Sequence, residues 1–180
     1  MLGGLSAADA EDAVLPFPNT DANRREASPT FPRKEPEPMK DRLYPRATVT
    51  PKGEKALRGG HPWVYADEVT SLSAAPEDGG LVDVYSNKDK YLGTGFYNCH
   101  SKIRIRILSR NANDSFDSLF WERRLRYAVA YRRTVMGETD FKCCRLIFGE
   151  ADGFPGLTVD RFENVLVAQV LSLGIEKVKD

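Results

Sequence analysis

Hydrophobic and polar positions alternate most strictly in the stretch "KIRIRIL", residues 102–108. Isoleucines at 103, 105 and 107 are separated by Arg104 and Arg106, and this period of two predicts a β-strand with one apolar and one cationic face. Further strands are predicted where short apolar runs are bounded by turn residues, over 47–50, 81–86 and 91–98. The turns between them are predicted at Asp78–Gly80 and Asn87–Lys90.

A short helix is predicted inside this strand-rich region, from Pro51 to about Arg58. Thr50 is expected to cap it, Pro51 to take its first position, and Gly59–Gly60 to end it. The chain then returns to an extended segment over 61–69. Glycines 93 and 95 inside a predicted strand indicate sharp bending or close backbone approach. These elements together predict a small β-barrel over residues 47–111.

A long helix is predicted to open a second unit, over residues 117–136, with Asp117 as its N-cap. Strands are predicted over 142–150, 157–162 and 164–173, with a turn over 151–156 and the first turns of a helix over 174–180. Residues 112–180 are therefore predicted to form a small α+β unit whose last element has no end in the chain. The arginines of the long helix are expected to cover its outer faces, and its apolar face is expected to hold Phe120, Leu125, Ala128, Tyr131 and Val135.

Residues 1–46 show no hydrophobic period. Seven of the eleven prolines lie there, charges of both signs are mixed, and apolar residues are scattered. Such a segment cannot bury enough surface to offset its chain entropy, so we predict a disordered, proline-rich tail. An arm that binds RNA or a partner protein stays open as an alternative, although the charges alternate in sign rather than cluster.

The composition limits which chemistry to expect. The 26 basic and 26 acidic residues cancel, so net charge gives no indication of a polyanionic partner. The three cysteines contain no C-x-x-C spacing and the two histidines lie far apart in sequence, which predicts no metal site and favours a reducing, cytoplasmic compartment. No apolar run reaches the ~18–20 residues needed to cross a bilayer, and the first residues lack a basic region, so neither a membrane nor a signal peptide is expected.

The cationic face of the alternating strand is the first candidate site. Lys102, Arg104 and Arg106 are expected to lie about 7 Å apart, from a strand rise of ~3.3 Å per residue. This approaches the spacing of phosphates along a nucleic-acid strand, and an ordinary solvated face fits the pattern equally well. Such a patch would position RNA through phosphates without reading its sequence. Four more basic residues extend the patch if the barrel brings them together: Arg110, Lys52, Lys55 and Arg58.

Aromatic residues near this strand have two interpretations. His61, in "GGHPWVY", can contact a base or phosphate, although a histidine after a helix end more often bonds backbone. Trp63 is expected in the core with its indole N–H satisfied locally. Tyr91, Phe96 and Tyr97 can stack bases, but a small barrel also needs aromatics for its own core.

The stretch "GEADGFPGLTVDRF", residues 149–162, is the third candidate. Glu150 and Asp152 can form an acid/base pair, but a carboxylate pair without a shaped, partly dry pocket is weak evidence for catalysis. Asp152–Gly153 and Pro155–Gly156 are turn dipeptides, so we favour carboxylates that fix a turn by bonding backbone N–H groups. On that interpretation, loss of the Asp152 charge costs on the order of 1 kcal/mol. Asp160 and Arg161 are expected to pair with each other or with neighbours.

Four segments together resemble a known family: "KGEKALRGGHPWVYADEV", "VDVYSNKDKYLGTGFYN", "KIRIRIL" and "RLIFGEADGFPGLTVDRFENVLVAQ". They are similar to class I methyltransferases that methylate C5 of a cytosine in large-subunit ribosomal RNA. The resemblance covers residues 47–180 and implies a PUA domain followed by a central α+β domain. It also implies RNA, in particular ribosomal RNA, as the partner and S-adenosylmethionine as the cofactor of the full-length family.

The resemblance also sets limits. The family's catalytic domain would follow the matched region, so the resemblance implies no cofactor and no catalytic residue in this chain, and Cys99, Cys143 and Cys144 inherit no catalytic role. We therefore expect the RNA-binding part of an rRNA methyltransferase, truncated before the methyltransferase domain. A stand-alone PUA-type RNA-binding module stays open as the alternative. A small hydrolase or lyase that uses Glu150 and Asp152 has the least support.

Overall fold

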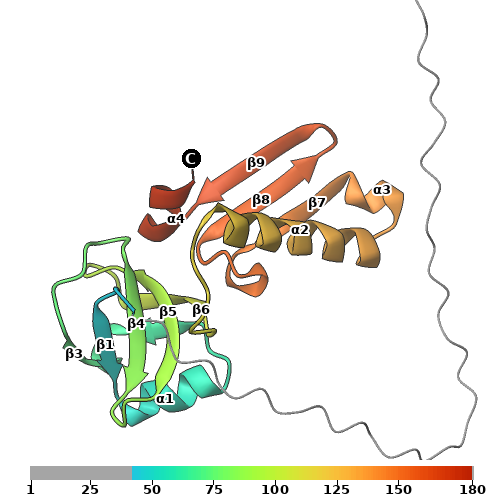
Figure 1. Ribbon diagram of the computed structural model, residues 1–180. Helices are drawn as coiled ribbons and strands as arrows, with labels where there is room; N and C mark the ends of the chain where they lie inside the picture. The colour runs from blue at the N-terminus through green and yellow to red at the C-terminus, as the bar shows by residue number, and fades with distance from the viewer. Residues whose placement is uncertain (1–41, 180) are drawn as a thin grey trace, which may run out of the picture. The chain divides into compact units, whose positions relative to one another are not determined.

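The computed structural model describes residues 42–179, and the first part of this region is a curled six-stranded sheet with one short helix (Figure 1). The strand order is β2-β6-β5-β4-β1-β3, in which β1 and β4 are parallel and every other neighbouring pair is antiparallel. The elements are β1 (Arg46–Val49), α1 (Pro51–Arg58), β2 (Trp63–Tyr65), the 3-10 turn η1 (Ala66–Glu68), β3 (Val69–Leu72), β4 (Leu81–Ser86), β5 (Tyr91–Tyr97) and β6 (Ile103–Ser109).

The curled sheet closes around an apolar core that follows from the alternating sequence. Val64, Val82, Val84 and Ile105 are fully buried there, each on the inward-facing side of its strand. Helix α1 begins as predicted, since the Thr50 hydroxyl accepts a hydrogen bond from the Gly53 N–H at 3.2 Å and a proline takes the first turn. The predicted small barrel with a capped helix is thus confirmed in its main features.

Glycines 93 and 95 on β5 meet the expectation of close backbone approach. A Cβ atom at position 95 would overlap the backbone carbonyl of Arg106 on β6, and Gly93 has a φ of +155°. Only glycine leaves room for β6 at this crossing. The bend allows β5 to pair with β4 on one side and β6 on the other.

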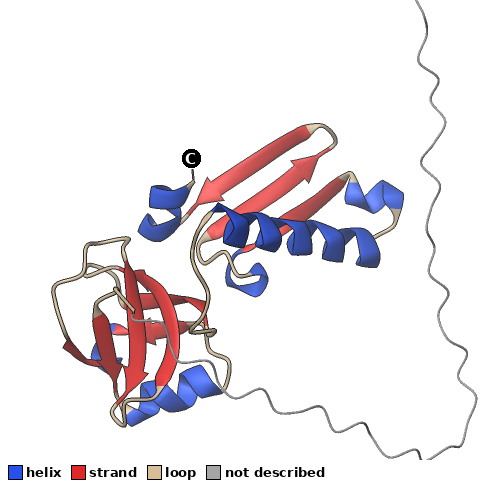
Figure 2. Cartoon of the chain, in the orientation of Figure 1, coloured by secondary structure: helices blue, strands red, loops and turns tan. Residues whose placement is uncertain are grey.

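The second part of the described region is a three-stranded antiparallel sheet, order β7-β8-β9, with helices on one side (Figure 2). The predicted Asp117 N-cap is confirmed, because its carboxylate accepts the Phe120 N–H at 2.9 Å. Ala128, Leu146, Ile147 and Phe154 form the core between the long helix and the sheet. The elements are α2 (Ser118–Val135), α3 (Glu138–Phe141), β7 (Cys143–Phe148), the 3-10 turn η2 (Gly149–Asp152), β8 (Leu157–Phe162), β9 (Val165–Val170) and α4 (Leu173–Val178).

The predicted apolar face of α2 is wrong in part. Phe120 and Ala128 are buried as expected, but Leu125, Tyr131 and Val135 are 41%, 59% and 55% exposed. The inward positions near the sheet are instead taken by Arg124 and Arg132, together with Trp121. These arginines find carbonyl and carboxylate partners on η2 and its neighbours, contacts that helical periodicity alone does not show.

Several predicted bounds shift. The extended segment 61–69 is interrupted by η1, the predicted strand 142–150 ends at Phe148 because η2 begins at Gly149, and the predicted strand 164–173 ends at Val170. Ser172 then caps α4 by accepting the Ile175 N–H at 3.3 Å. Helix α3 was not predicted.

The predicted start of order at residue 47 lies too late. Strand β1 begins at Arg46, and the Arg42 guanidinium is buried against Asp83 and Thr94 of the curled sheet. A single arginine reaching a strand 41 residues away leaves no periodic signal in the sequence. The disorder predicted for the tail itself, through residue 41, falls outside the described residues.

The predicted division at residues 111 and 112 does not separate two compact bodies. Helix α4 contacts β5 so closely that a Cβ at Gly174 would overlap the ring of Phe96. Phe96 and Leu108 of the curled sheet share one apolar cluster with Phe120 and Ile175. All described residues accordingly belong to one compact unit.

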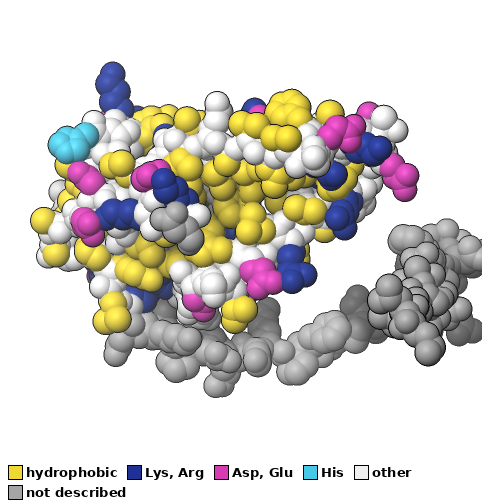
Figure 3. Space-filling view, turned by 90° about the horizontal axis from the view of Figure 1, so that it is seen from above, with side chains coloured by type: hydrophobic (Ala, Val, Ile, Leu, Met, Phe, Trp, Pro, Cys, Tyr) yellow, Lys and Arg dark blue, Asp and Glu magenta, His cyan; other side chains and the backbone are white. Residues whose placement is uncertain are grey.

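Large apolar side chains stay exposed over the second sheet and α4. Figure 3 shows hydrophobic side chains gathered across the middle of one face of the protein. Exposed apolar residues of β9, α4 and the loop between them are Val165, Leu166, Val167, Leu171, Leu173 and Val178. Val165 and Val167 lie on the opposite face of β9 from Leu166, so exposed apolar side chains occupy both faces of this strand. Within residues 42–179, no helix is long and apolar enough to cross a membrane.

Candidate nucleic-acid interface

Strand β2 displays a short row of aromatic side chains. His61, Trp63 and Tyr65 alternate with the fully buried Val64, so they share the outward side of the strand. Their ring centroids lie 5.7 Å apart for His61 and Trp63, 6.4 Å apart for Trp63 and Tyr65, and 5.9 Å apart for His61 and Tyr65, so the three rings form a compact group. All three residues are half-buried, which leaves part of this group accessible for contact with a base. We call His61, Trp63 and Tyr65 the aromatic row because they alternate along the chain.

Trp63 is held by a contact that the sequence did not indicate. Its indole N–H donates to Glu150 Oε1 at 2.7 Å, and Arg106 donates to the same oxygen at 2.5 Å. The Arg106 guanidinium also lies 5.4 Å from the Trp63 ring centroid. The expectation of a locally satisfied indole is therefore wrong, because its partner lies 87 residues away on η2. Glu150 joins the curled sheet to the second sheet.

Only some of the predicted cations on β6 are free to contact a phosphate. Arg106 is paired with Glu150, and Arg104 donates to the carbonyls of Asn98, at 3.0 Å, and Cys99. Lys102 precedes the strand and is exposed. Of the three, Lys102 is thus the most available for a phosphate, while Arg104 and Arg106 retain only part of their donor capacity.

Three of the predicted basic residues lie near the aromatic row. The backbone of Lys102 contacts Ala66 of η1, next to Tyr65, and Lys52 Nζ lies 4.0 Å from Asp67 and 3.8 Å from Glu68 with its side chain 78% exposed. Arg110 donates to the His61 carbonyl at 2.9 Å. Basic residues therefore lie close to the aromatic row, an arrangement that suits stacked bases with phosphates nearby.

The remaining predicted residues take mixed positions. Arg58 donates to Glu54 at 2.9 Å within α1, and Lys55 is exposed on the same helix. The His61 ring accepts the Trp63 N–H at 3.2 Å, the backbone interaction that sequence reasoning favoured for it. Tyr97 is buried in the core, and the Tyr91 hydroxyl contacts Thr94 at 2.7 Å. Burial raises the pKa of Tyr91 above its ordinary value, with the hydrogen bond between Tyr91 and Thr94 acting in the opposite direction.

The two carboxylates of the η2 turn form ion pairs with different arginines. Asp152 accepts from both terminal nitrogens of Arg132, at 3.2 and 2.6 Å, and from the Phe148 N–H at 2.6 Å. Glu150 instead accepts hydrogen bonds from Trp63 and Arg106. Two carboxylates that are each neutralised by an arginine make a poor acid/base pair, so the geometry supports a structural role for both.

The glycines of the same turn adopt backbone conformations that other residues rarely reach. Gly153 has a φ of +77° and Gly156 a φ of +86°, and Pro155 between them is buried. A Cβ at Gly153 would collide with the Arg124 guanidinium, and one at Gly156 would lie 2.6 Å from the Ser172 Cβ. The turn is therefore packed against α2 on one side and the N-cap of α4 on the other.

Asp160 and Arg161 do not pair with each other. Asp160 accepts two bonds from Arg145 across the sheet, at 2.8 and 3.0 Å, and Arg161 donates to the Glu163 carbonyl at 2.8 Å. Adjacent residues on a strand point to opposite faces, so a pair between them was unfavourable from the start. The hydrogen bonds from Arg145 hold the pKa of Asp160 below its ordinary value.

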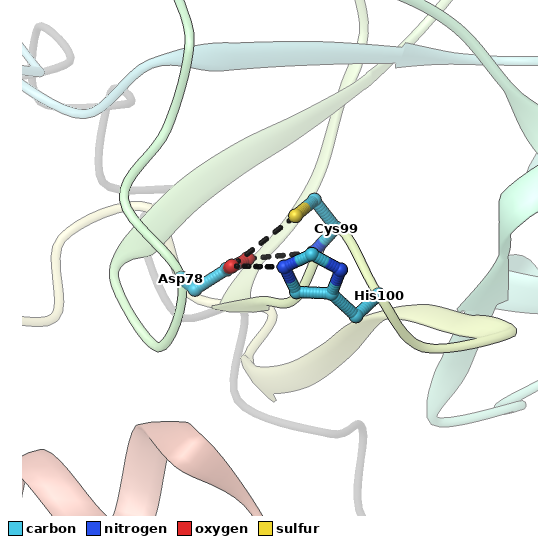
Figure 4. A group of neighbouring side chains, drawn as sticks. All are labelled: Asp78, Cys99 and His100. Atoms are coloured by element: carbon cyan, nitrogen blue, oxygen red, sulfur yellow. Dashed lines mark hydrogen bonds and ion pairs between the residues drawn. The ribbon is translucent and has the colours of Figure 1, made fainter.

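A further cluster brings together Asp78, Cys99 and His100, as Figure 4 shows. The Cys99 N–H donates to Asp78 at 2.6 Å, the Cys99 thiol lies 3.1 Å from the same carboxylate, and His100 Nε2 lies 3.4 Å from it. These residue types can ligate zinc, and sequence reasoning missed the cluster because Asp78 is 21 residues away. Hydrogen bonds within the cluster account for each contact, so we assign no metal to it.

The cluster makes a testable prediction for Cys99. The hydrogen bond to Asp78 raises the pKa of the Cys99 thiol, and the bond from the Cys99 N–H lowers the pKa of Asp78. A raised thiol pKa means less thiolate at pH 8, so Asp78→Asn should make Cys99 react faster with iodoacetamide. The stabilisation from this thiol is present at neutral pH and is lost as the pH rises through its folded pKa.

Exposed Cys143 on β7 provides the internal control for this reaction. Mass spectrometry of the two cysteine peptides should show acceleration at Cys99 alone. An unchanged or slower rate at Cys99 would show that the Asp78 carboxylate does not hold its proton.

Comparison with known proteins accounts for both parts of the fold. The sequence profile of the PUA-like domain family matches residues 47–110, the curled sheet. The chain is 38% identical over 138 residues to ribosomal RNA large subunit methyltransferase I of Klebsiella pneumoniae subsp. pneumoniae. This match covers 77% of this chain and 34% of the relative. The protein of the same name from Pseudoalteromonas atlantica is 39% identical over 135 residues, 75% of this chain and 34% of the relative.

Solved structures agree on the fold. "A putative sam-dependent methyltransferase from Streptococcus mutans" superimposes with a TM-score of 0.64 at 18% identity, over 75% of this chain and 35% of that one. The chain spans about a third of the length of the curated relatives it matches. The predicted α+β fold with a PUA-like barrel is confirmed, the chain carries a PUA-like domain, and the matched region is similar to proteins named ribosomal RNA large subunit methyltransferase I.

Proposed function

We propose that this chain is the RNA-binding portion of an rRNA methyltransferase, and that its PUA-like sheet binds ribosomal RNA. The observation that carries the proposal is the aromatic row with basic residues close to it, on a domain whose relatives are named for ribosomal RNA methylation. Basic side chains would contact phosphates, and the exposed ring faces would stack on unpaired bases.

The second sheet would position the bound RNA relative to a methyltransferase domain. Glu150 fixes its orientation toward the RNA-binding sheet through Trp63 and Arg106, and the exposed apolar surface of β9 and α4 offers the docking face. The proposed full-length activity is methylation of a cytosine at C5, with S-adenosylmethionine as the methyl donor and a cytoplasmic location.

The described residues themselves offer no Rossmann-type site for that donor. Such a site lies at the carboxyl ends of parallel strands. Within residues 42–179 the single parallel pair is β1 with β4, inside the curled sheet. RNA binding is therefore the activity proposed for this chain. No observation favours a stand-alone RNA-binding module over the RNA-binding portion of a methyltransferase.

The interface is tested by removing the charges of two exposed lysines near the aromatic row. Lys52→Gln with Lys102→Gln should weaken binding to a structured RNA and reduce the log–log salt slope by roughly 1.5, about 0.7–0.9 per lost phosphate contact. Fluorescence anisotropy over a series of salt concentrations measures both quantities.

The matched control is Lys88→Gln with Lys90→Gln. It removes the same charge from the exposed turn between β4 and β5. Equal losses in the two double variants would mean that net charge, rather than this surface, determines binding.

A further inference from the structure

A groove runs between the curled sheet and helix α2, apart from the aromatic row. It encloses about 720 Å³ and is lined by Arg110 at the end of β6, by Arg124, Tyr127 and Tyr131 of α2, and by the η2 turn. A second hollow of about 410 Å³ shares Gly60 and Arg110 with it and continues toward the end of α1. The two hollows therefore lie side by side at Gly60 and Arg110.

The cations of this groove lack anionic partners, whereas its anions are already neutralised. Glu150 is paired with Arg106 and Asp152 with Arg132. Arg110 and Arg124 make no ion pair with any of residues 42–179. The groove therefore holds two arginines that the carboxylates of its lining do not neutralise.

Of Arg110 and Arg124, Arg124 gives the stronger indication of an anion-binding site. Its guanidinium donates to the carbonyls of Leu108, at 2.7 Å, and Gly153, and so spans both sheets. Burial lowers its pKa, and the nearby charge of Asp114 opposes this effect without forming a contact. A half-buried cation that bonds only neutral carbonyls loses part of its hydration, and an anion entering the groove would offset that cost.

Two aromatic side chains complete the groove. Tyr127 and Tyr131 lie four positions apart, on one side of α2, and are 67% and 59% exposed. Large aromatic rings left open beside unpaired arginines match the surfaces that bind single-stranded nucleic acid, where rings stack on bases and cations contact the backbone.

We infer that this groove binds a single-stranded RNA segment, whose bases stack on Tyr127 and Tyr131 and whose phosphates contact Arg110 and Arg124. The inference rests on the proposed function and extends it. Because Arg110 also contacts the His61 carbonyl, a strand leaving the aromatic row reaches the groove directly. The chain would thus bind a structured RNA on the PUA-like sheet and an adjoining unpaired segment beside α2.

The test compares an RNA hairpin that carries a single-stranded extension of about eight nucleotides with the same hairpin made blunt. The full chain should bind the extended hairpin more tightly. Tyr127→Ala with Tyr131→Ala should remove that preference, by about fivefold or more for each stacked base, and leave binding of the blunt hairpin unchanged. Arg110→Gln should reduce the salt slope for the extended hairpin by about 0.7.

The control is Leu119→Ala with Leu125→Ala, two exposed apolar residues of α2 outside the groove. It should keep the preference, and a melting curve of each variant shows that it is folded. A tyrosine variant that keeps the full preference, or a wild-type chain without one, overturns the groove inference and leaves the proposed function standing. Failure of the wild-type chain to bind either hairpin overturns the proposed function itself.

An acidic peptide is the other occupant that the charges admit. If polyglutamate binds the groove in a tyrosine-dependent manner while the extension adds nothing to RNA affinity, the assignment to RNA is wrong.

Discussion

Asp152→Ala should destabilise the protein by about 3–5 kcal/mol, more than the ~1 kcal/mol expected from the sequence, because it leaves the buried Arg132 without its counter-charge. The side chains of Asp152 and Arg132 are 12% and 11% exposed, and two hydrogen bonds join them. The same carboxylate also accepts the Phe148 N–H at the end of β7. Chemical denaturation should show the loss as a lower midpoint, and thermal melting should fall by on the order of 10 °C.

Asp160→Ala is the matched control for this prediction. It removes an aspartate that also bonds an arginine twice, but the side chains of Asp160 and Arg145 are 27% and 43% exposed. Solvent screens such a pair, so its loss should change the midpoint far less. Similar midpoints for the two variants would show that the Asp152 pair is no more important than a surface contact.

Arg42→Met should destabilise the protein by a similar amount, about 3–5 kcal/mol, because it leaves the Asp83 carboxylate buried and unpaired. The side chains of Arg42 and Asp83 are 8% and 2% exposed, and the arginine donates to both carboxylate oxygens, at 2.6 and 2.8 Å. Burial alone would lower the pKa of Arg42, but the hydrogen bond and charge of Asp83 raise it above its ordinary value.

Arg46→Met gives the comparison, because Arg46 pairs with Asp89, whose side chain is 82% exposed. That substitution should cost less than about 1 kcal/mol. Both free energies of unfolding come from urea titrations of the full chain. If Arg42→Met is as mild as Arg46→Met, the ordered region begins at residue 47, as the sequence pattern predicted.

The sequence predicted the elements that depend on interactions between residues close together in the chain. The "KIRIRIL" alternation, the Thr50 and Asp117 caps, and the glycines of β5 each act within a few residues, and the structure contains all of them. Strand β8 was predicted to the residue. A pattern that repeats every two or four residues can be read directly from the chain.

The errors concern contacts between distant segments. Helix α2 turns Arg124 and Arg132 inward because η2 offers them a carbonyl and a carboxylate. Trp63 finds Glu150, and Arg42 finds Asp83, at separations of 87 and 41 residues. Each contact depends on how the two sheets meet, which no local period encodes.

The sequence indicated basic and aromatic residues for the candidate interface, but it did not indicate how they are arranged. The expected continuous row of Lys102, Arg104 and Arg106 is interrupted, since the two arginines are engaged by carbonyls and by Glu150. Arg110 instead donates to the His61 carbonyl, and Lys52 lies near Asp67 and Glu68. The RNA-binding roles of these residues remain predictions.

Binding of the full 180-residue chain to a hairpin from large-subunit ribosomal RNA tests the central claim most directly. Anisotropy should show saturable binding at low salt, with log affinity falling linearly as log salt rises, by roughly 0.7–0.9 for each phosphate contact. Lys52→Gln with Lys102→Gln should flatten that slope. Absence of saturable RNA binding at low salt, or an affinity that does not change with salt, would contradict the account.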